Sequence, residues 1–524
     1  MDTKALRQKI LDLAIRGKLV PQDPNDEPAS VLLGRIRQQK QQMVKEGKLK
    51  PKDIKNDSVI FVGEDNLHYE KFADDSVKCI EDEIPFELPD GWAWERLSNL
   101  ASFSGGKTPS TSRSEYWDGD ILWVTSKDMK SKYITSSQLR LSTLGAEQMQ
   151  MYQPDTLLLV TRSGILRHTL PVAILKECAT INQDLKAIIL YMPQLAEYIY
   201  VCLKGMETQL LLKYTKSGTT VENVNFDEFQ KVLLPIPPIQ QIDRIMSSTG
   251  SAESVVSTIE DDKAALADYV IKAKSKILDL AIRGQLVPQD PDDEPASVLL
   301  ERIRAEKEEL IKQGKIKRDK KESVIFRGED NSYYVRQDTH TESIDEQFIF
   351  ELPDNWEWCS LLNIAKIELG KTLDSAKNIG INYPYLRSVN VRWNEVDLSD
   401  LKAMRFEPEE LDRYTVRQND LLICEGGDVG RSCVWTDEKE ILYQNALHKV
   451  RFYGGCNPFY FMYYMMYYES RGIIKALCKG VTIKHLTGNV LSLIPFALPP
   501  LEEQNLIVER LNRIFVLLDS IICD

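Results

Sequence analysis

Several short motifs in this chain contain residue types that catalytic sites use, and the first is a glycine-lysine-threonine turn. Gly105-Gly106-Lys107-Thr108 ends like a phosphate-binding loop. Such a loop also needs a glycine five residues before Gly106, so that backbone N–H groups can surround the phosphates. Ala101 stands there, and Ala365 stands at the same place before a second turn, Gly370-Lys371-Thr372. We therefore exclude a nucleoside-triphosphate loop.

The other motifs are equally incomplete. Asn457-Pro458-Phe459-Tyr460 resembles the Asn-Pro-Pro-Tyr element of DNA N6-adenine methyltransferases, but its second proline is missing and no glycine-rich S-adenosylmethionine loop stands upstream. We interpret it as a helix start, with Asn457 as the cap and Pro458 in the first turn. Glu46-Gly47-Lys48 is interpreted as a helix end. No histidine has a partner at metal spacing, so we expect no zinc site; the histidines are His68, His168, His340, His448 and His485.

The composition restricts the class of protein. The net charge of −13 is unusual for a nucleic-acid binder, but the acidic excess lies mainly outside residues 90–240 and 354–500, so each block can still carry a basic face. No apolar run approaches the ~18–20 residues of a membrane span. We find no signal-peptide pattern at the N-terminus. The nine cysteines include no CxxC pair, which favours a reducing, cytoplasmic compartment.

The strongest pattern is an internal repeat. The sequence ILDLAIRGKLVPQDPNDEPASVLL at 10–33 recurs at 277–300 with only Lys18/Gln285 and Asn25/Asp292 changed. Three further motifs follow in the same order: Leu-Pro-Asp-x-Trp at 88–92 and 352–356, the Gly-Lys-Thr turns, and Pro-Pro at 237–238 and 499–500. By contrast, residues 110–215 and 374–478 share little beyond length and apolar pattern. Two copies of one scaffold therefore carry two different inserts; the alternative is a duplicated structural domain with one drifted copy.

Apolar residues at helical spacing predict helices around the inserts. We expect helices at 2–15, ending before Gly17, and at 27–47, with the second copy of the latter ending at Gly314. Residues 239–283 lack proline and predict one long helix, weakened locally at Gly250. Residues 501–524 continue the apolar pattern after the second Pro-Pro pair.

Alignment of the two proline pairs makes 501–524 the counterpart of 239–262. The offset of 267 between the repeats at 10–33 and 277–300 makes residue 1 the counterpart of residue 268. We therefore predict that 501–524 and 1–16 jointly mimic 239–283, and that the two termini lie close together. Long helices with apolar faces bury those faces against each other, so we expect antiparallel, coiled-coil-like pairs.

The predicted fold class is α+β, a pseudo-two-fold tandem repeat. Two mixed α/β domains are separated by two long antiparallel helical spacers. Strands are expected at 121–124, 156–160, 172–175, 420–424 and 432–435, and later helices at 194–213 and 458–478. The predicted segments are a helical region at 1–47, a linker at 48–89, the first insert at 90–238, a central spacer at 239–314, a linker at 315–353, the second insert at 354–500 and a last helix at 501–524.

The doubled order of these motifs resembles the specificity subunits of Type I restriction-modification enzymes. The resemblance covers essentially the whole chain and rests on the LPDGWAW-type opening at 88–94, the Gly-Lys-Thr turn, a glycine-threonine turn at 218–220 and the proline-rich exit at 234–238. It implies that each insert is a target-recognition domain that reads one half of a bipartite site in double-stranded DNA. It further implies that the helices set the gap between the halves.

The resemblance also implies the partners. Two modification (methyltransferase) subunits, which bring S-adenosylmethionine, would dock on the helices, and two restriction subunits would bring ATP- and Mg-dependent translocation and nuclease activity. This chain would hold no catalytic residue, cofactor or metal, and would act in the cytoplasm of a bacterium or archaeon without contacting a membrane. A self-contained DNA adenine methyltransferase fusion and a structural adaptor without DNA contact remain the alternatives.

Candidate DNA contacts lie in polar turns of the two inserts. Arg and Lys suit guanine, Asn and Gln suit adenine, and Lys, Arg, Ser and Thr suit phosphates. In the first insert the candidates are Lys107, Thr108, Ser126, Lys127, Arg162, Ser163, Arg167, Lys216, Ser217 and Thr219. In the second insert they are Lys371, Thr372, Arg387, Ser388, Asn390, Arg392, Arg431, Lys479, Thr482 and Lys484. Positions that recur in both copies, such as Lys107 and Lys371, suit phosphate or structural roles better than base choice.

Overall fold

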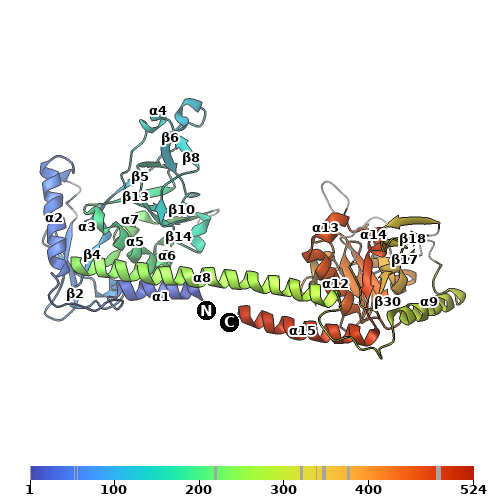
Figure 1. The fold of residues 1–524 in the computed structure, drawn as a ribbon. Coiled ribbons are helices and arrows are strands. Elements are labelled where there is room, and N and C mark those ends of the chain that lie inside the picture. Colours follow the sequence, from blue (N-terminus) through green and yellow to red (C-terminus); the bar gives the residue numbers. More distant parts are fainter. Residues whose placement is uncertain are drawn as a thin grey trace. The chain divides into compact units, whose positions relative to one another are not determined.

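The computed structural model divides the chain into two compact units, Met1–Asp262 and Lys263–Asp524, each with one copy of the repeat (Figure 1). The structure describes residues 2–51, 54–55, 57–216, 221–318, 323–337, 339–344, 350–374, 378–478 and 485–523. Among these residues no helix is long and apolar enough to cross a membrane. Each unit is described by itself below.

The near-identical repeat motif forms helices in both units. In the first unit, α1 (Thr3–Ile15) is capped by Asp2, whose carboxylate accepts a hydrogen bond from the backbone N–H of Ala5 at 3.0 Å. α2 (Ala29–Lys45) follows the polar turn. In the second unit, the same sequence forms the last part of α8 (Ile239–Ile282) and then α9 (Ala296–Lys312). The predicted helices are confirmed, and α8 continues through Gly250.

The glycine after the first repeated helix has a packing role. Gly17 has φ +64°, and a Cβ added there would lie 2.6 Å from Pro89 Cγ. In the second unit, Gly284 has φ +68°, and its added Cβ would lie 2.5 Å from Pro353 Cγ. Only glycine combines this backbone conformation with so close an approach. The helix end and the Leu-Pro-Asp motif are therefore packed together in both copies.

A tryptophan joins the repeated motifs in the first unit. The indole Nε1 of Trp92 donates hydrogen bonds to Gln22 Oε1 at 3.1 Å and to Gln241 Oε1 at 2.9 Å. Gln22 comes from the polar turn after α1, and Gln241 comes from the start of α8. The turn, the beginning of the insert and the helix after the insert thus meet at one point.

The second unit repeats this junction with one change. Trp356 Nε1 donates to Glu503 Oε2 at 2.8 Å, and Gln289 Nε2 donates to Glu503 Oε1 at 2.6 Å. Glu503 lies at the start of α15 (Leu501–Cys523) and takes the place of Gln241. A buried carboxylate therefore stands where the first unit has a neutral amide.

We expect the substitution Glu503→Gln to stabilise the second unit by about 1 kcal/mol at neutral pH. Burial raises the pKa of Glu503, although hydrogen bonds from Trp356 and Gln289 oppose the shift. An acid with a raised folded-state pKa loses stability as pH rises from its unfolded to its folded pKa. Thermal unfolding at mildly acidic and at neutral pH measures this. The unfolding temperature should fall less between the two pH values in the variant than in wild type. A variant less stable than wild type at both pH values would contradict the prediction.

The segments predicted to be linkers each fold into a small antiparallel sheet. In the first unit, Ser58–Val62, His68–Phe72 and Val77–Cys79 form β1, β2 and β3. In the second unit, Ser323–Arg327, Tyr333–Gln337 and His340–Ser343 form β17, β18 and β19. β1 is an apolar run, yet its Val59, Phe61 and Val62 side chains are exposed, so this sheet lies at the surface and not in a core.

Each insert is closed at its base by its own first and last strands. β4 (Ala93–Arg96) pairs antiparallel with β16 (Leu233–Ile236), and β20 (Glu357–Ser360) pairs antiparallel with β31 (Pro495–Leu498). The chain therefore enters and leaves each insert at adjacent points.

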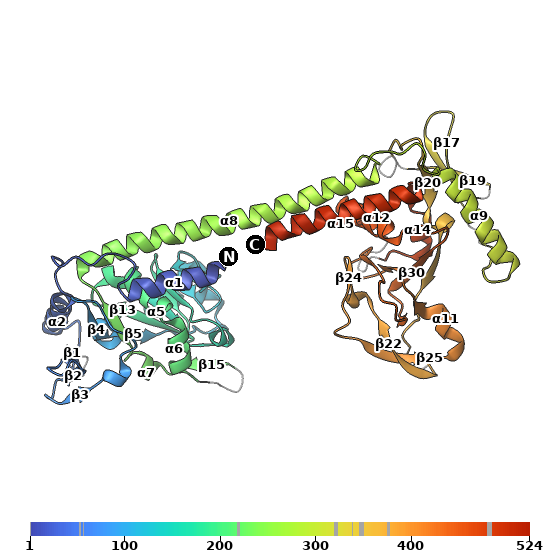
Figure 2. The same ribbon diagram turned by 90° about the horizontal axis from the view of Figure 1, so that it is seen from below.

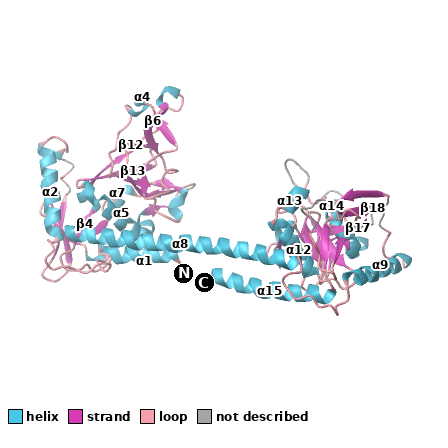
Figure 3. Cartoon of the chain, in the orientation of Figure 1, coloured by secondary structure: helices cyan, strands magenta, loops and turns pink. Residues whose placement is uncertain are grey.

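The first insert is built on a five-stranded sheet with the order β5-β13-β9-β11-β7. Helix α5 contributes to the core beside this sheet, and a three-stranded sheet with the order β12-β6-β8 lies beyond it (Figure 3). The strands are β5 (Ala101–Gly105), β6 (Trp117–Val124), β7 (Tyr133–Ile134), β8 (Leu139–Leu141), β9 (Leu157–Val160), β11 (Val172–Leu175), β12 (Ala179–Ile181) and β13 (Leu185–Leu190). The predicted helix 194–213 is interrupted at Met206 into α5 (Ala196–Gly205) and α6 (Glu207–Tyr214).

The second insert has two four-stranded sheets, with the orders β21-β30-β27-β28 and β25-β22-β29-β26. Its strands are β21 (Ala365–Leu369), β22 (Ile381–Leu386), β25 (Lys402–Phe406), β26 (Thr415–Val416), β27 (Leu421–Cys424), β28 (Ser432–Val434), β29 (Ile441–Tyr443) and β30 (Leu447–Phe452). The predicted helix 458–478 is divided at Gly472 (φ +72°) into α12 (Pro458–Ser470) and α13 (Ile473–Leu477). Both inserts are thus mixed α/β, as predicted.

Each unit contains an antiparallel helix pair (Figure 2). In the first unit, Arg7 of α1 contacts Glu253 and Glu260 of α8 at 3.2 and 3.0 Å. Gln22, which follows α1, lies near Gln241 at the start of α8, so the two helices run in opposite directions. In the second unit, α15 begins beside the turn after α8, and its Asp519 accepts from Lys274 Nζ at 2.5 Å. α1 and α15 therefore pair with the first and last parts of α8. The predicted closeness of the two termini stays a prediction.

Candidate nucleic-acid interface

The two Gly-Lys-Thr turns pack against the ends of β12 and β29. A Cβ on Gly106 would lie 2.1 Å from the carbonyl oxygen of Ile181, and one on Gly370 would lie 2.2 Å from that of Gln444. The backbone N–H of Lys107 donates to the Ile181 carbonyl at 3.0 Å. These glycines permit a close approach of the two backbones. The Lys107 N–H is already hydrogen-bonded within the protein, so it is not free to bind a phosphate.

The lysines of these turns differ between the copies. Lys107 is exposed, and the neighbouring Thr108 hydroxyl donates to Gln183. Lys371 is buried and paired with Glu410. Lys371 is therefore not accessible to a nucleic acid, and its expected contact is withdrawn; Thr372 beside it is exposed. A buried ion pair and an exposed phosphate contact look the same in sequence.

A small sheet in the first insert collects exposed polar side chains. β10 (Arg162–Ser163), β15 (Glu222–Val224) and β14 (Thr215–Lys216) pair antiparallel, with Asn223 opposite both Arg162 and Lys216. Directly opposite residues point to the same face of a sheet. Arg162, Asn223 and Lys216 therefore form one exposed row, which we call the Arg-Asn-Lys row. Asn223 was not among the predicted contacts, because only the long-range pairing of β10 with β15 brings it beside Arg162.

The other candidates of the first insert have local partners. The Ser163 hydroxyl accepts from the Ile165 N–H at 3.4 Å, and Arg167 Nε donates to the buried Glu222 at 2.7 Å. Lys127 is exposed in the turn after β6, and Ser126 beside it is half-buried. Ser217 and Thr219 lie outside the described residues.

In the second insert, Asn390 is a structural residue. Its Oδ1 accepts from the Arg387 N–H at 2.9 Å, and its Nδ2 donates to the carbonyls of Asp397 and Asp400 at 2.9 and 3.1 Å. The side chain is buried. Its expected contact with DNA is therefore withdrawn: an asparagine that closes a turn was mistaken for one that reads a base.

Arg387 and Arg431 converge on the same turn. Arg387 Nη2 donates to Asp400 Oδ2 at 2.7 Å, and Arg431 Nη2 donates to the Ser388 carbonyl at 3.0 Å while its other end pairs with Asp428. Both side chains are about 15% exposed, and the Nε of each is buried without a hydrogen-bond partner. Arg392 is exposed in β23 (Val391–Arg392), and Ser388 is half-buried. Lys479, Thr482 and Lys484 lie outside the described residues.

The remaining motifs have structural roles. Asn457 caps α12 by accepting a hydrogen bond from the Phe459 N–H at 3.0 Å, which confirms the interpretation as a helix start. Glu46 follows the last residue of α2, as predicted. Within the described part of the chain, no three His, Cys, Asp or Glu side chains are grouped so that they could hold a metal ion.

Two stretches of the chain, 89–252 and 353–521, match the family model described as "Type I restriction modification DNA specificity domain". The chain belongs to this family. The two stretches coincide with the two inserts and the helices that follow them. The specificity-domain chain therefore carries two target-recognition domains on a duplicated scaffold.

Known relatives support this assignment over the full length. The chain is 26% identical to the Type I restriction enzyme EcoAI specificity subunit of Escherichia coli, over 98% of this chain and 88% of the relative. It is also 26% identical to the EcoEI specificity subunit of Escherichia coli, over 82% and 74% of the two chains. A chain of a solved type I R-M system has the same fold, with a TM-score of 0.50 and 16% identity over 83% of this chain and 93% of that one. By its family and these relatives, the chain is a specificity subunit of the Type I restriction-modification class.

Proposed function

We propose that each target-recognition domain reads one half of a bipartite site in double-stranded DNA, while the helix pairs fix the gap between the halves. One observation carries the proposal: equivalent junctions at Trp92 and Trp356 hold two inserts whose exposed polar groups differ. The first presents the Arg-Asn-Lys row, and the second presents Thr372 and Arg392. A repeated scaffold with different polar faces suits two different base sequences.

The proposed complex contains two modification subunits that bring S-adenosylmethionine and two restriction subunits that bring ATP and Mg-dependent cleavage, in the cytoplasm of a bacterium or archaeon. The described cysteines are all free, in keeping with a reducing compartment. With a net charge of −13, this chain alone should hold DNA weakly, so partner subunits are expected to supply much of the affinity for phosphates.

The decisive experiment exchanges residues 90–238 for the corresponding insert of another family member and maps methylation with the partner methyltransferase. The adjacent ends of the insert, paired as β4 and β16, allow the exchange without a change in the scaffold. We expect one half-site to change and the other to stay the same. If both halves changed, or neither did, the modular proposal would be wrong.

The modification subunits are proposed to dock on exposed apolar residues of the spacer helices. In the second unit, Ile271 of α8 is 66% exposed and Val516 of α15 is 69% exposed. Clusters of exposed aliphatic side chains commonly mark protein interfaces.

We expect Ile271→Asp together with Val516→Asp to weaken assembly with the methyltransferase by at least about tenfold, since burying an unpaired carboxylate is costly. Co-purification and sedimentation measure the assembly. The matched control is Lys272→Asp, on the same helix beside Ile271. Because the substituted side chains are exposed, thermal unfolding of the free chain should be unchanged, and an unchanged assembly would refute this docking surface.

A further inference from the structure

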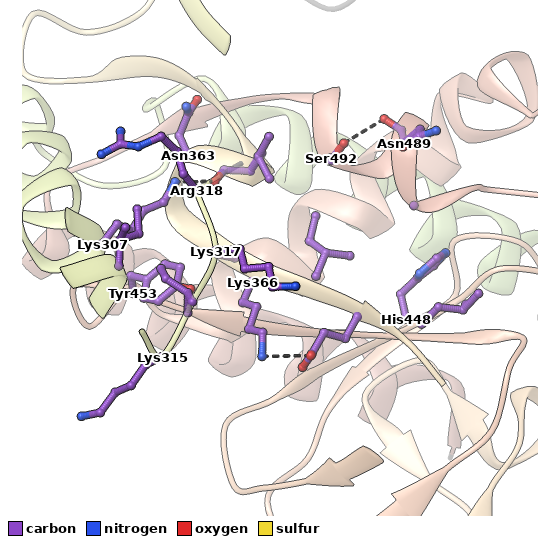
Figure 4. Close-up of a pocket in the computed structure, with 18 of the residues that line it drawn as sticks. Lys307, Lys315, Lys317, Arg318, Asn363, Lys366, His448, Tyr453, Asn489 and Ser492 are labelled. Carbon is purple, nitrogen blue, oxygen red and sulfur yellow. Dashed lines mark hydrogen bonds and ion pairs between the residues drawn. The ribbon is translucent and has the colours of Figure 1, made fainter. Parts of the chain in front are cut away.

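A cavity of about 1450 Å³ opens in the second unit among α9, β21 and α14 (Gly488–Leu493) (Figure 4). Seven lysine and arginine side chains line it, against two carboxylates. Those carboxylates already have cationic partners: Glu308 accepts from Arg318 at 2.6 Å, and Glu368 pairs with Lys366 at 2.9 Å. In a chain with net charge −13, this lining is strongly basic.

Part of this positive charge has no partner. Among the described residues, Arg304, Lys315 and Lys317 make no side-chain hydrogen bond or ion pair that would neutralise them. Figure 4 shows Lys317 and Lys366 near the middle of the close-up, whereas Lys315 points away from it. Of the two uncompensated lysines, Lys317 is therefore the one that lies toward the middle of the cavity.

One difference between the two copies leaves space at the wall of the cavity that contains Gly488. In the first unit, the ring of Phe226 packs edge-on against Phe103 at 5.3 Å, and Lys186 lies over the Phe226 ring at 5.5 Å. The proline pairs align Phe226 with Gly488, so the second unit lacks this aromatic ring. A Cβ on Gly488 would touch only His448, at 3.6 Å, and the backbone there is not left-handed. The space that a side chain fills in one copy is open in the other.

The wall beside Gly488 contains an unsatisfied acceptor. His448 is 1% exposed, and its Nε2 lies 2.8 Å from the Leu486 carbonyl, which fixes the proton on that nitrogen. Its Nδ1 is consequently an acceptor, and it has no hydrogen-bond partner. Burial lowers the pKa of His448, so the ring is neutral at neutral pH. Such orphaned groups are rare in folded proteins.

We propose that this cavity binds a phosphate ester, either a free nucleotide or a stretch of nucleic-acid backbone, in the second unit. The phosphate lies among the lysines around Lys317 and Lys366, and a hydroxyl or amino donor of the ligand faces the wall formed by His448. The residues proposed to read the second half-site, Thr372 and Arg392, do not line this cavity, so the inference goes beyond the proposed function.

The test titrates the full-length chain with two fluorescent probes, labelled ATP and a labelled duplex without the recognised sequence. Wild type should bind at least one of them. Lys317→Gln and Lys366→Gln should each weaken that binding about fivefold, because each removes a cation close to the phosphate. The matched control is Lys312→Gln, which removes the same charge from α9 outside the cavity and should leave binding within twofold of wild type.

Gly488→Phe restores the residue of the first copy and should weaken binding by occupying the part of the cavity beside His448. If that variant fails to fold, the Lys317→Gln and Lys366→Gln variants alone decide whether the cavity binds the probe. Binding of ATP alone identifies a nucleotide site, and binding of the duplex alone identifies a backbone contact; both support the proposal. It is overturned if wild type binds neither probe, or if Lys312→Gln weakens binding as much as Lys317→Gln does. Half-site choice by the assembled complex is measured separately, so this proposal and the proposed function can fail independently.

Discussion

Replacing Trp356 with alanine should destabilise the second unit by about 3–5 kcal/mol, the range for a large buried aromatic side chain. The indole is 3% exposed and packs edge-on against Tyr460, with ring centroids 6.4 Å apart. Its removal leaves a cavity where the insert joins the helices. It also removes one of the donors to Glu503, whose charge then stays buried with less compensation.

Chemical denaturation of the full chain, followed by hydrogen exchange in each unit, measures this loss. Trp356→Phe is the matched control: it keeps most of the ring volume and loses the N–H, so it should cost only about 1–2 kcal/mol. The first unit, with its own Trp92 junction, is an internal reference. Equal destabilisation by both substitutions would show that the hydrogen bond, and not the packing, determines the stability of this junction.

The second large effect is expected at the Arg-Asn-Lys row. Arg162→Ala and Asn223→Ala should each reduce discrimination at one half-site by about 1–3 kcal/mol, which is roughly fivefold to 150-fold. Both side chains are exposed, and the Arg162 guanidinium makes no hydrogen bond or ion pair with described residues. They are therefore available to base edges, and their removal should not disturb the core.

Competition gel shifts with the partner methyltransferase, using duplexes altered in one half at a time, measure the discrimination. Lys130→Ala, an exposed cation elsewhere in the same insert, is the control and should leave discrimination unchanged. Uniform weakening on all sequences would mean that the row contacts phosphates. Loss of discrimination in both halves would contradict the assignment of the row to a single half-site.

The helical scaffold could be predicted from sequence because its signals are local. Apolar spacing, Gly17 and the Pro-Pro pairs define α1, α8 and α15 within one or two residues. Gly250 was expected to weaken α8, but a Cβ there would touch nothing and the helix continues. The sheets at 58–79 and 323–343 were missed because short, half-exposed strands give little periodicity.

The candidate site could be predicted only in part, because exposure depends on long-range packing. Lys371 has the same sequence context as Lys107, yet it is buried against Glu410. Asn390 has the chemistry of a base reader, yet its polar atoms close a turn. Asn223 was overlooked because its alignment with Arg162 depends on the pairing of strands far apart in sequence.

The ladders at the base of each insert, β4 with β16 and β20 with β31, have a consequence for how such a protein changes over generations. Since each insert begins and ends at one strand pair, recombination that exchanges a single insert can give the protein a new recognised DNA sequence. Poor packing of an exchanged insert destabilises only that insert. The helices proposed to bind the partner subunits keep their structure.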